Sequence, residues 1–227
     1  VVGFKPTYGL VSRFGLVTCA PSLEQIGCIT KDVTDCAYVL EEIGFYDKKD
    51  STSTNNANSS YTNYLVDDIK DLKIGIPKEI FDESWDPDVR TYINSSIETL
   101  KKLGAQIVDI TLPHFKYASA SHFIIMSCES SSNLARYDGI KYGKRAQNAD
   151  DLEELYCKTR SQGFGQEVKG RIMLGNLFLT SKYYDSHYKK ALKIRELLRD
   201  DFSKAYEKCH LILTPTSPIL AYDFSSQ

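Results

Sequence analysis

The amino-acid sequence predicts an α/β fold. Residues 72–77 and 106–112 have the apolar pattern of strands, and they flank a segment at 86–103 that has helical periodicity. Strand, helix and strand in this order form a unit whose two strands are parallel. Four segments further along the chain also have helical periodicity. The composition of the 227 residues, 42% hydrophobic and 26% charged, is typical of a globular protein.

Charge and hydropathy exclude several other classes of protein. Lysine and arginine number 28 against 30 for aspartate and glutamate, so the chain lacks the basic excess of a nucleic-acid-binding protein. No apolar run approaches the roughly 18 residues that a membrane span needs. The 15 tyrosines and 10 phenylalanines argue against disorder. The six cysteines are scattered without a Cys-x-x-Cys pair, which favours buried free thiols in a reducing compartment.

The N-terminal elements are expected in the following order. Residues 1–4 have the pattern of a buried strand, and a long loop rich in glycine and proline follows. An apolar stripe at 32–43, with Asp32 near its start and Gly44 after its end, predicts a helix. Residues 46–64 are polar and low in complexity, which predicts a surface loop.

The C-terminal half is expected to be mostly helical. Helices are predicted at four segments, 117–137, 151–160, 165–179 and 181–208. The glycines around Phe164 predict a flexible turn between two helices, because a phosphate-binding loop would follow a strand. A short buried strand is predicted at 211–213.

Common catalytic and metal-binding patterns are absent from the sequence. It contains no His-Glu-x-x-His, no Gly-x-x-x-x-Gly-Lys-Ser/Thr and no Gly-x-Ser-x-Gly, and its four histidines lack the spacing of metal ligands. No metal site is therefore predicted. Residues 4–15 and 129–139 are richer in small and polar groups than a plain core requires. Within the second segment, Ser131 to Asn133 disfavour a helix, which leaves two hypotheses open: a pocket wall or a polar contact between helices.

Several motifs together resemble the amidase signature family. They are Val-Gly-Phe-Lys-Pro-Thr-Tyr-Gly-Leu-Val-Ser-Arg-Phe-Gly-Leu at 2–16, Ser-Leu-Glu-Gln-Ile-Gly at 22–27, Asp-Ser-Thr-Ser at 50–53, Ser-Ser-Asn-Leu-Ala-Arg-Tyr-Asp-Gly at 131–139, and Pro-Thr-Ser-Pro at 215–218. The resemblance runs along the whole chain, and the run at 131–139 favours the A subunits of tRNA-dependent amidotransferases. It implies an amidase-signature fold, with a mixed central sheet covered by helices and incomplete in this fragment. Residues 1–227 are then part of a single amidase domain, truncated at both ends.

The resemblance also implies a reaction. Family members of this kind release ammonia from glutamine for the conversion of Glu-tRNA(Gln) to Gln-tRNA(Gln), which uses ATP. A serine nucleophile attacks the amide, assisted by a second serine in a cis peptide and by a lysine. All three are expected upstream of Val1, so no catalytic residue is assigned here and the fragment alone is expected to be inactive. The alternatives are another amidase-signature amide hydrolase or a truncated, non-catalytic binding chain.

Substrate-binding residues are implied by position. Arg171 matches an arginine that pairs with the α-carboxylate of the substrate, a role suited to the planar guanidinium. The alternative is a surface arginine on a helix. His122 and Phe123 stand where relatives often carry paired tyrosines, but Phe123 has no hydroxyl and His122 offers only a ring nitrogen. The acidic partner of the substrate amino group is expected beyond Gln227.

Cofactors, partners and location follow from the same resemblance. No cofactor is expected in this chain, while ATP and Mg are used by the complex through its B subunit. The expected partners are the B and C subunits in a heterotrimer, glutamine, and misacylated tRNA through the B subunit, with no membrane involved. A bacterial cytoplasmic protein is expected, with an organelle as the alternative. The choice between Gln and Asn tRNA does not follow from the sequence.

Overall fold

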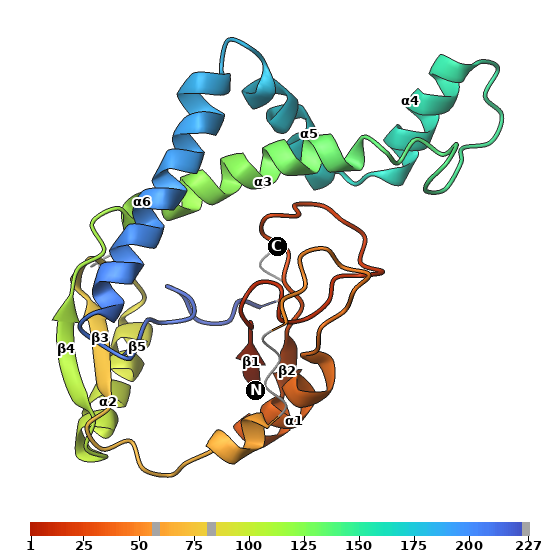
Figure 1. Ribbon diagram of the computed structural model, residues 1–227. Helices are drawn as coiled ribbons and strands as arrows, with labels where there is room; N and C mark the ends of the chain where they lie inside the picture. Colours follow the sequence, from red (N-terminus) through yellow and green to blue (C-terminus); the bar gives the residue numbers. More distant parts are fainter. Residues whose placement is uncertain (56–59, 81–84, 224–227) are drawn as a thin grey trace. The chain divides into compact units, whose positions relative to one another are not determined.

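A computed structural model of the chain describes residues 1–55, 60–80 and 85–223 (Figure 1). The chain divides into two compact units. The first unit consists of Val1–Leu65 and Phe123–Tyr188, and the second of Val66–His122 and Lys189–Gln227. Each unit therefore combines two segments that are distant in the sequence. Within the described ranges, no helix has both the length and the apolar character needed to cross a membrane.

The first unit begins with a small antiparallel sheet. β1 (Val2–Phe4) pairs with β2 (Cys28–Thr30), and α1 (Val33–Ile43) packs against both strands. The helix begins where the Asp32 side chain accepts a 2.8 Å hydrogen bond from a backbone N–H, which confirms the predicted start. The prediction that the first strand is buried is wrong. α1 covers Cys28, whereas Ile29 on the opposite face of the sheet is 80% exposed. Phe4 pairs with Cys28 and is nevertheless 44% exposed.

The polar segment at 46–64 contains one 3₁₀ helix, η1 (Tyr61–Tyr64), and residues 56–59 of the segment lie outside the described residues. Most of its described side chains are exposed or half-buried. Asp50 is buried. Its carboxylate is satisfied by hydrogen bonds that it accepts from the backbone N–H groups of Arg13, at 2.8 Å, and Thr52, at 2.9 Å. Part of the polarity of this segment therefore serves internal contacts rather than solvation.

Helices make up the rest of the first unit. α3 (Ala118–Leu134), which begins in the other unit, α4 (Leu152–Gly163) and α5 (Gln166–Leu179) confirm three of the predicted helical segments. The turn at Phe164 connects α4 to α5, as predicted. Gly175 allows α5 to approach α3 closely, because a Cβ at this position would collide with the backbone of Ser127.

The single helix predicted at 181–208 is interrupted. A π-helical turn, η4 (Tyr184–Tyr188), precedes α6 (Lys189–Tyr206). The His187 ring in this turn stacks on Phe178 with ring centroids 5.3 Å apart, and it meets the edge of Tyr183 at 5.4 Å. The wider π-helical turn is compatible with these ring contacts. Because Phe178 belongs to the preceding helix, α5, the hydrophobic periodicity of residues 181–208 does not reveal the contact.

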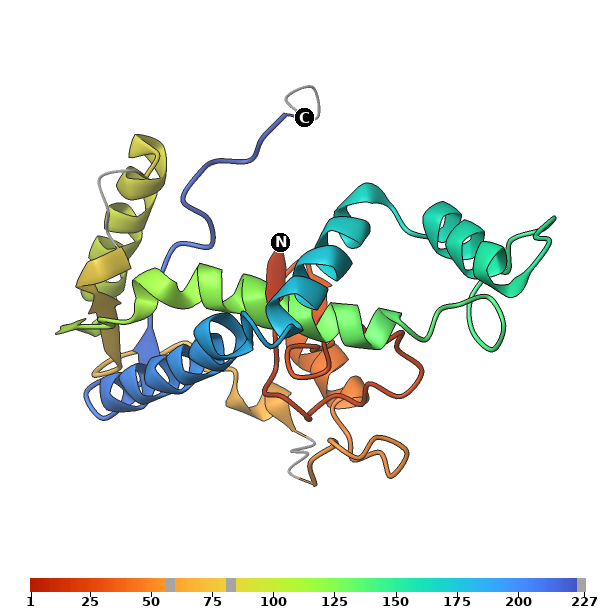
Figure 2. The same ribbon diagram turned by 90° about the horizontal axis from the view of Figure 1, so that it is seen from above.

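The second unit contains a three-stranded parallel sheet. β3 (Lys73–Pro77) lies between β4 (Gln106–Ile110) and β5 (Leu211–Ile212), and α2 (Pro87–Lys102) connects β3 to β4. This confirms the predicted strand–helix–strand unit. Figures 1 and 2 show α2 and α6 on opposite faces of the sheet. Short 3₁₀ helices, η2 (Lys78–Ile80) and η3 (Phe115–Tyr117), lie in its connections.

The core of the second unit lies between the sheet and α6. Ile110, Leu112, Ala205 and Cys209 form its buried centre, and Phe202 packs against them. The strand predicted at 211–213 is present as β5, but the prediction that it is buried is wrong. Leu211 is 51% exposed, because β5 pairs with β3 on one side and has no second neighbour among the described residues.

A buried carboxylate anchors α6 to the connection after β4. Asp201 is 6% exposed and accepts a 2.9 Å hydrogen bond from the backbone N–H of His114. One of its oxygens also lies 3.0 Å from the His114 ring nitrogen Nδ1. The helix is therefore held by a polar contact as well as by its apolar side.

Candidate functional site

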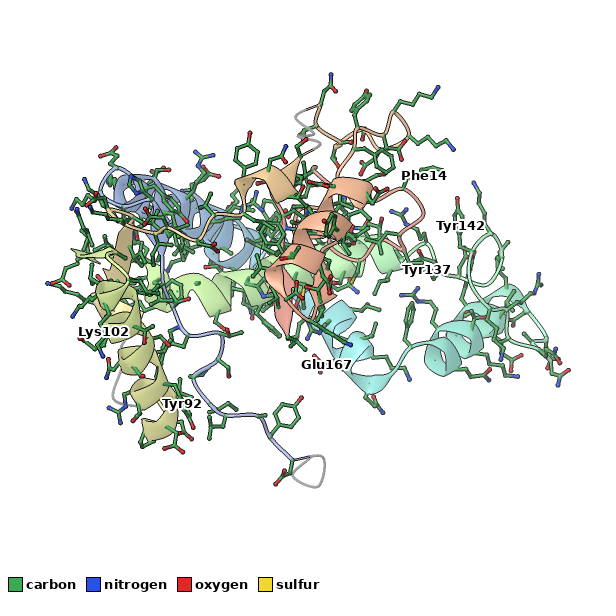
Figure 3. All side chains as sticks on the ribbon, turned by 90° about the horizontal axis from the view of Figure 1, so that it is seen from below. Phe14, Tyr92, Lys102, Tyr137, Tyr142 and Glu167 are labelled. Carbon is green, nitrogen blue, oxygen red and sulfur yellow. The ribbon has the colours of Figure 1, made fainter. Side chains whose placement is uncertain are left out.

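The predicted carboxylate-binding arginine lies in the middle of α5. Atoms Nε and Nη2 of Arg171 lie 2.8 and 2.7 Å from Oε1 of Glu167, one helical turn earlier (Glu167 is labelled in Figure 3). Nη1 donates to the sulfur of Met126 on α3 at 3.1 Å. The Arg171 side chain is 31% exposed, against 74% for Glu167. The guanidinium is thus positioned between a thioether and a solvent-exposed carboxylate.

α3 carries the other two residues predicted to bind substrate. Phe123 is 40% exposed and lies three residues before Met126, so the two side chains share a face of the helix. Because Met126 contacts Arg171, this is the face that α3 directs toward the arginine. His122 is exposed and falls in the other compact unit. We therefore group only Phe123 with Arg171.

The polar C-terminal part of α3 serves both of the roles that the sequence left open. The hydroxyl of Ser131 donates a 2.7 Å hydrogen bond to the Asn176 side chain of α5, which is a polar contact between helices. Other side chains of the same segment line a cavity of about 350 Å³. The cavity is lined by Pro21, Ser22, Cys128, Glu129, Ser132, Asn133, Leu179 and Tyr188.

Glu129 joins α3 to the N-terminal loop. Ser22 donates its backbone N–H to this carboxylate at 2.9 Å and its hydroxyl to the other carboxylate oxygen. The thiol of Cys19 lies 3.1 Å from the hydroxyl of Ser130. The loop that bears the Ser-Leu-Glu-Gln-Ile-Gly motif is therefore fastened directly to the cavity wall.

Arg13 makes a second set of contacts that hold the N-terminal loop. Its guanidinium donates to the carbonyl of Pro21 at 2.7 Å and to the hydroxyl of Thr52 at 2.9 Å, and it lies 5.2 Å from the centre of the Tyr8 ring. Two carboxylates flank it, with Glu24 at 3.4 Å and Asp50 at 3.6 Å. One half-buried cation thus connects residues from both ends of a segment of roughly forty positions.

The environment of Asp50 keeps it ionised. Hydrogen bonds lower the pKa of this carboxyl from 3.8 to about 2, the largest effect coming from the backbone N–H of Arg13. Burial opposes this lowering, whereas the N–H and hydroxyl of Thr52 and the charge of Arg13 add to it. The carboxylate is therefore charged at all physiological pH values and holds the Arg13 loop in place.

The end of α3 is closed by a second arginine. Nη1 of Arg160 donates to the carbonyls of Leu134 and Tyr137 at 2.9 and 3.2 Å, which satisfies backbone acceptors at the helix terminus. The ring of Tyr137 then meets that of Tyr142 edge to face, with centroids 6.4 Å apart (Figure 3). The Asn-Leu-Ala-Arg-Tyr-Asp-Gly part of the sequence motif forms this ordered exit from the helix.

Sequence reasoning missed the two anchors of the N-terminal loop, Arg13 and Glu129. The contact of Arg13 with Asp50 spans 37 positions and that of Glu129 with Ser22 spans 107, so no local pattern reveals these two contacts. The charged residues within the two polar segments were the available signal. Among the residues that the structure describes, no group of three histidine, cysteine, aspartate or glutamate side chains could hold a metal ion.

The family match and the relatives of similar sequence point to the same group of proteins. The chain matches the family described as Amidase over residues 1–227. The A subunit of the glutamyl-tRNA(Gln) amidotransferase of Thermoanaerobacter pseudethanolicus is 56% identical over 222 residues, which cover 98% of this chain and 46% of that protein. The corresponding protein of Heliobacterium modesticaldum is 50% identical over 227 residues, covering 100% and 47%. The chain thus spans about half the length of the curated relatives it matches.

Solved structures show the same similarity. The A subunit of the glutamyl-tRNA(Gln) amidotransferase of Thermotoga maritima matches with a TM-score of 0.73 and 34% identity, over 98% of this chain and 44% of that one. A crystal structure of an amidase matches with a TM-score of 0.71 at 21% identity, over 98% and 42%, and shows likeness in fold. The predicted α/β, amidase-signature fold class is confirmed.

Proposed function

The chain belongs to the amidase family, and on this basis we propose that it is part of the glutamine-hydrolysing A subunit of a tRNA-dependent amidotransferase. The observation that carries the proposal is the match, at more than half identity along the whole chain, to a relative that is such an A subunit. The complete protein would release ammonia from glutamine for the conversion of Glu-tRNA(Gln) to Gln-tRNA(Gln), which uses ATP. Residues 1–227 would be part of a single amidase domain.

The proposal divides the chemistry between this chain and residues outside it. Hydrolysis of the glutamine amide consumes one water and yields glutamate and ammonia. The serine nucleophile, the cis-peptide serine and the lysine of the family's route are expected upstream of Val1. What this chain would supply is substrate binding on α3 and α5, and the ordered loop that Arg13 and Glu129 hold.

Arg171 is the residue we propose to bind the α-carboxylate of glutamine. Its present partner, Glu167, lies one turn away and is 74% exposed, so this pair is of the kind that contributes about 0.3–0.5 kcal/mol. An incoming carboxylate would displace Glu167 into water at little cost and gain two parallel N–H···O bonds. Met126 supports the guanidinium from the side of α3.

Phe123 is proposed to line the same substrate site as Arg171, whereas the proposal for His122, which falls in the other compact unit, rests on the resemblance alone. Phe123 would contribute an apolar wall, because its side chain has no group that hydrogen-bonds. His122 would contribute a ring nitrogen, as a donor or an acceptor according to its tautomer. This chain would therefore present an apolar ring and an imidazole at the two positions where relatives often carry tyrosine hydroxyls.

The remaining parts of the assembly are proposed by the same argument. The B and C subunits of the amidotransferase would be the partners, misacylated tRNA would be bound through the B subunit, and ATP with Mg would be used there. No cofactor would be bound by the present chain, and the complex would act in the cytoplasm.

The first test measures ammonia release by the full-length protein from free glutamine, with and without the B and C subunits. Release from glutamine that rises on addition of the partners supports the proposal. Activity on other amides, with none on glutamine, favours another amidase. No activity on any amide favours a non-catalytic binding chain.

The second test addresses Arg171. Arg171→Ala removes hydrogen bonds to a charged group, worth about 1.5–3 kcal/mol, so the KM for glutamine should rise roughly 10- to 100-fold. Arg199→Ala is the matched control, because Arg199 forms a similar 2.7 Å pair with Glu196 on α6. An unchanged KM in Arg171→Ala would remove this residue from the substrate site while leaving the glutaminase activity itself established.

A further inference from the structure

Two buried thiols face each other between β2 and α1. The Sγ atoms of Cys28 and Cys36 lie 3.3 Å apart, and the two residues are only 8% and 5% exposed. Both are free thiols in this structure. We propose that this pair is a disulfide-forming site, oxidised by a low-molecular-mass disulfide such as oxidised glutathione. The inference does not depend on the proposed function.

The backbone on each side fixes the pair. Cys28 is held opposite Phe4 in the β1–β2 register, and the N–H of Cys36 donates to the carbonyl of Asp32 at 3.3 Å in the first turn of α1. Sulfur atoms in a disulfide are about 2.0 Å apart, so the two atoms must approach by roughly 1.3 Å. The proposal assigns this movement to rotations of the two side chains.

The chemistry is a balanced exchange. One cysteine thiolate attacks oxidised glutathione, forms a mixed disulfide and expels one glutathione thiolate. The second cysteine thiolate attacks the cysteine sulfur of that mixed disulfide and expels the other glutathione. The two cysteines lose two protons and two electrons in total, and the electrons reduce one oxidised glutathione to two thiols.

Burial makes the exchange slow and selective. The pKa of the Cys36 thiol is raised, first by burial and then by the neighbouring Cys28 thiol, so Cys36 stays protonated at neutral pH while the pair is covered. Reaction therefore begins when the first turn of α1 opens to solvent. Cys19 and Cys157 are exposed and react sooner, but the Cys19 thiol faces the hydroxyl of Ser130 rather than a second thiol.

The experiment uses the full-length protein in glutathione buffers of increasing oxidised-to-reduced ratio. Equilibrium is approached from the reduced and from the oxidised protein, so that a slow rate is not mistaken for an absent bond. After acid quenching and alkylation, the protein is digested with trypsin without reduction. Cleavage after Lys31 separates the two cysteines into peptides 14–31 and 32–48, which remain joined only if a disulfide connects them. Because Cys19 lies in the first peptide, the measurement is made in a Cys19→Ser background.

We expect the joined peptides to rise to the major form with increasing oxidised glutathione, with the same midpoint from both directions. Cys28→Ser and Cys36→Ser should each abolish the joined mass, whereas Cys128→Ser, which removes a buried thiol of α3, should leave it unchanged. The proposal is overturned if both thiols remain open to alkylation at a ratio that fully modifies Cys157. It is also overturned if the joined peptides form only in urea-unfolded protein.

Discussion

The charge of Asp50 makes the N-terminal loop sensitive to acid. The pKa of this buried carboxyl is lowered from 3.8 to about 2, which corresponds to at most about 2 kcal/mol of folding free energy at pH 7. A carboxyl with a lowered pKa stabilises the folded state above its unfolded pKa and loses this effect as the pH falls through its folded pKa. Roughly half of the contribution should be lost by pH 3.

Asp50→Asn is the perturbation that isolates this charge. The amide keeps one acceptor oxygen but places an NH2 group toward the donors of Arg13, so we expect a loss of at least about 2 kcal/mol at pH 7. The free energy of unfolding is measured by urea denaturation of the full-length wild-type and variant proteins between pH 7 and 3. Asp109→Asn is the control, because Asp109 pairs with Lys78 on the surface and its side chain is 71% exposed. A difference between wild type and Asp50→Asn that stays constant down to pH 3 would refute the reasoning.

Three further changes test the packing. Asp201→Ala leaves the N–H of His114 without its acceptor and should cost about 1–3 kcal/mol in urea denaturation, whereas the exposed neighbouring variant Asp200→Ala should change the result by less than about 0.5 kcal/mol. Gly175→Ala forces a methyl group against the backbone of α3, so its thermal midpoint should fall by several degrees, and a midpoint equal to wild type would contradict the close approach. Asp32→Ala removes the cap of α1 and should cost about 1 kcal/mol, seen as faster hydrogen exchange in the first turn of that helix alone.

The sequence predicted those helices and strands that have their own apolar periodicity and helix-capping residues. The unit of β3, α2 and β4 has an apolar pattern in each piece, with Asp86 and Pro87 at the helix start and Gly104 near its end. The structure confirms the unit and the helix start, whereas the C-cap is Leu103 rather than Gly104. The π-helical turn before α6 was not predicted, and its stacking contact between His187 and Phe178 of the preceding helix leaves no pattern in the local sequence. Burial of β1 and β5 was also mispredicted, because apolar content alone does not say how many neighbours a strand has.

The candidate site divides in the same way. Arg171 was assigned to the substrate site through family resemblance, and this assignment stays a prediction. Its pairing with Glu167 follows from a spacing of four residues on one helix. Its contact with Met126 depends on how α3 and α5 pack, which no local pattern contains. The role of Arg13 was missed partly because two of its partners, Asp50 and Thr52, lie in a segment whose composition predicted only a solvated loop.

Because each compact unit is assembled from two separated stretches of chain, the order of synthesis matters for folding. The first 65 residues cannot complete their unit until residue 188 has left the ribosome. At roughly 5–20 residues per second, this wait is on the order of ten seconds. During that time Ser22 and Cys19 lack their partners on α3, Glu129 and Ser130, so this part of the N-terminal loop remains accessible to chaperones and proteases. Codon choice and chaperone supply during this interval should therefore affect the yield of folded protein more than substitutions on its final surface.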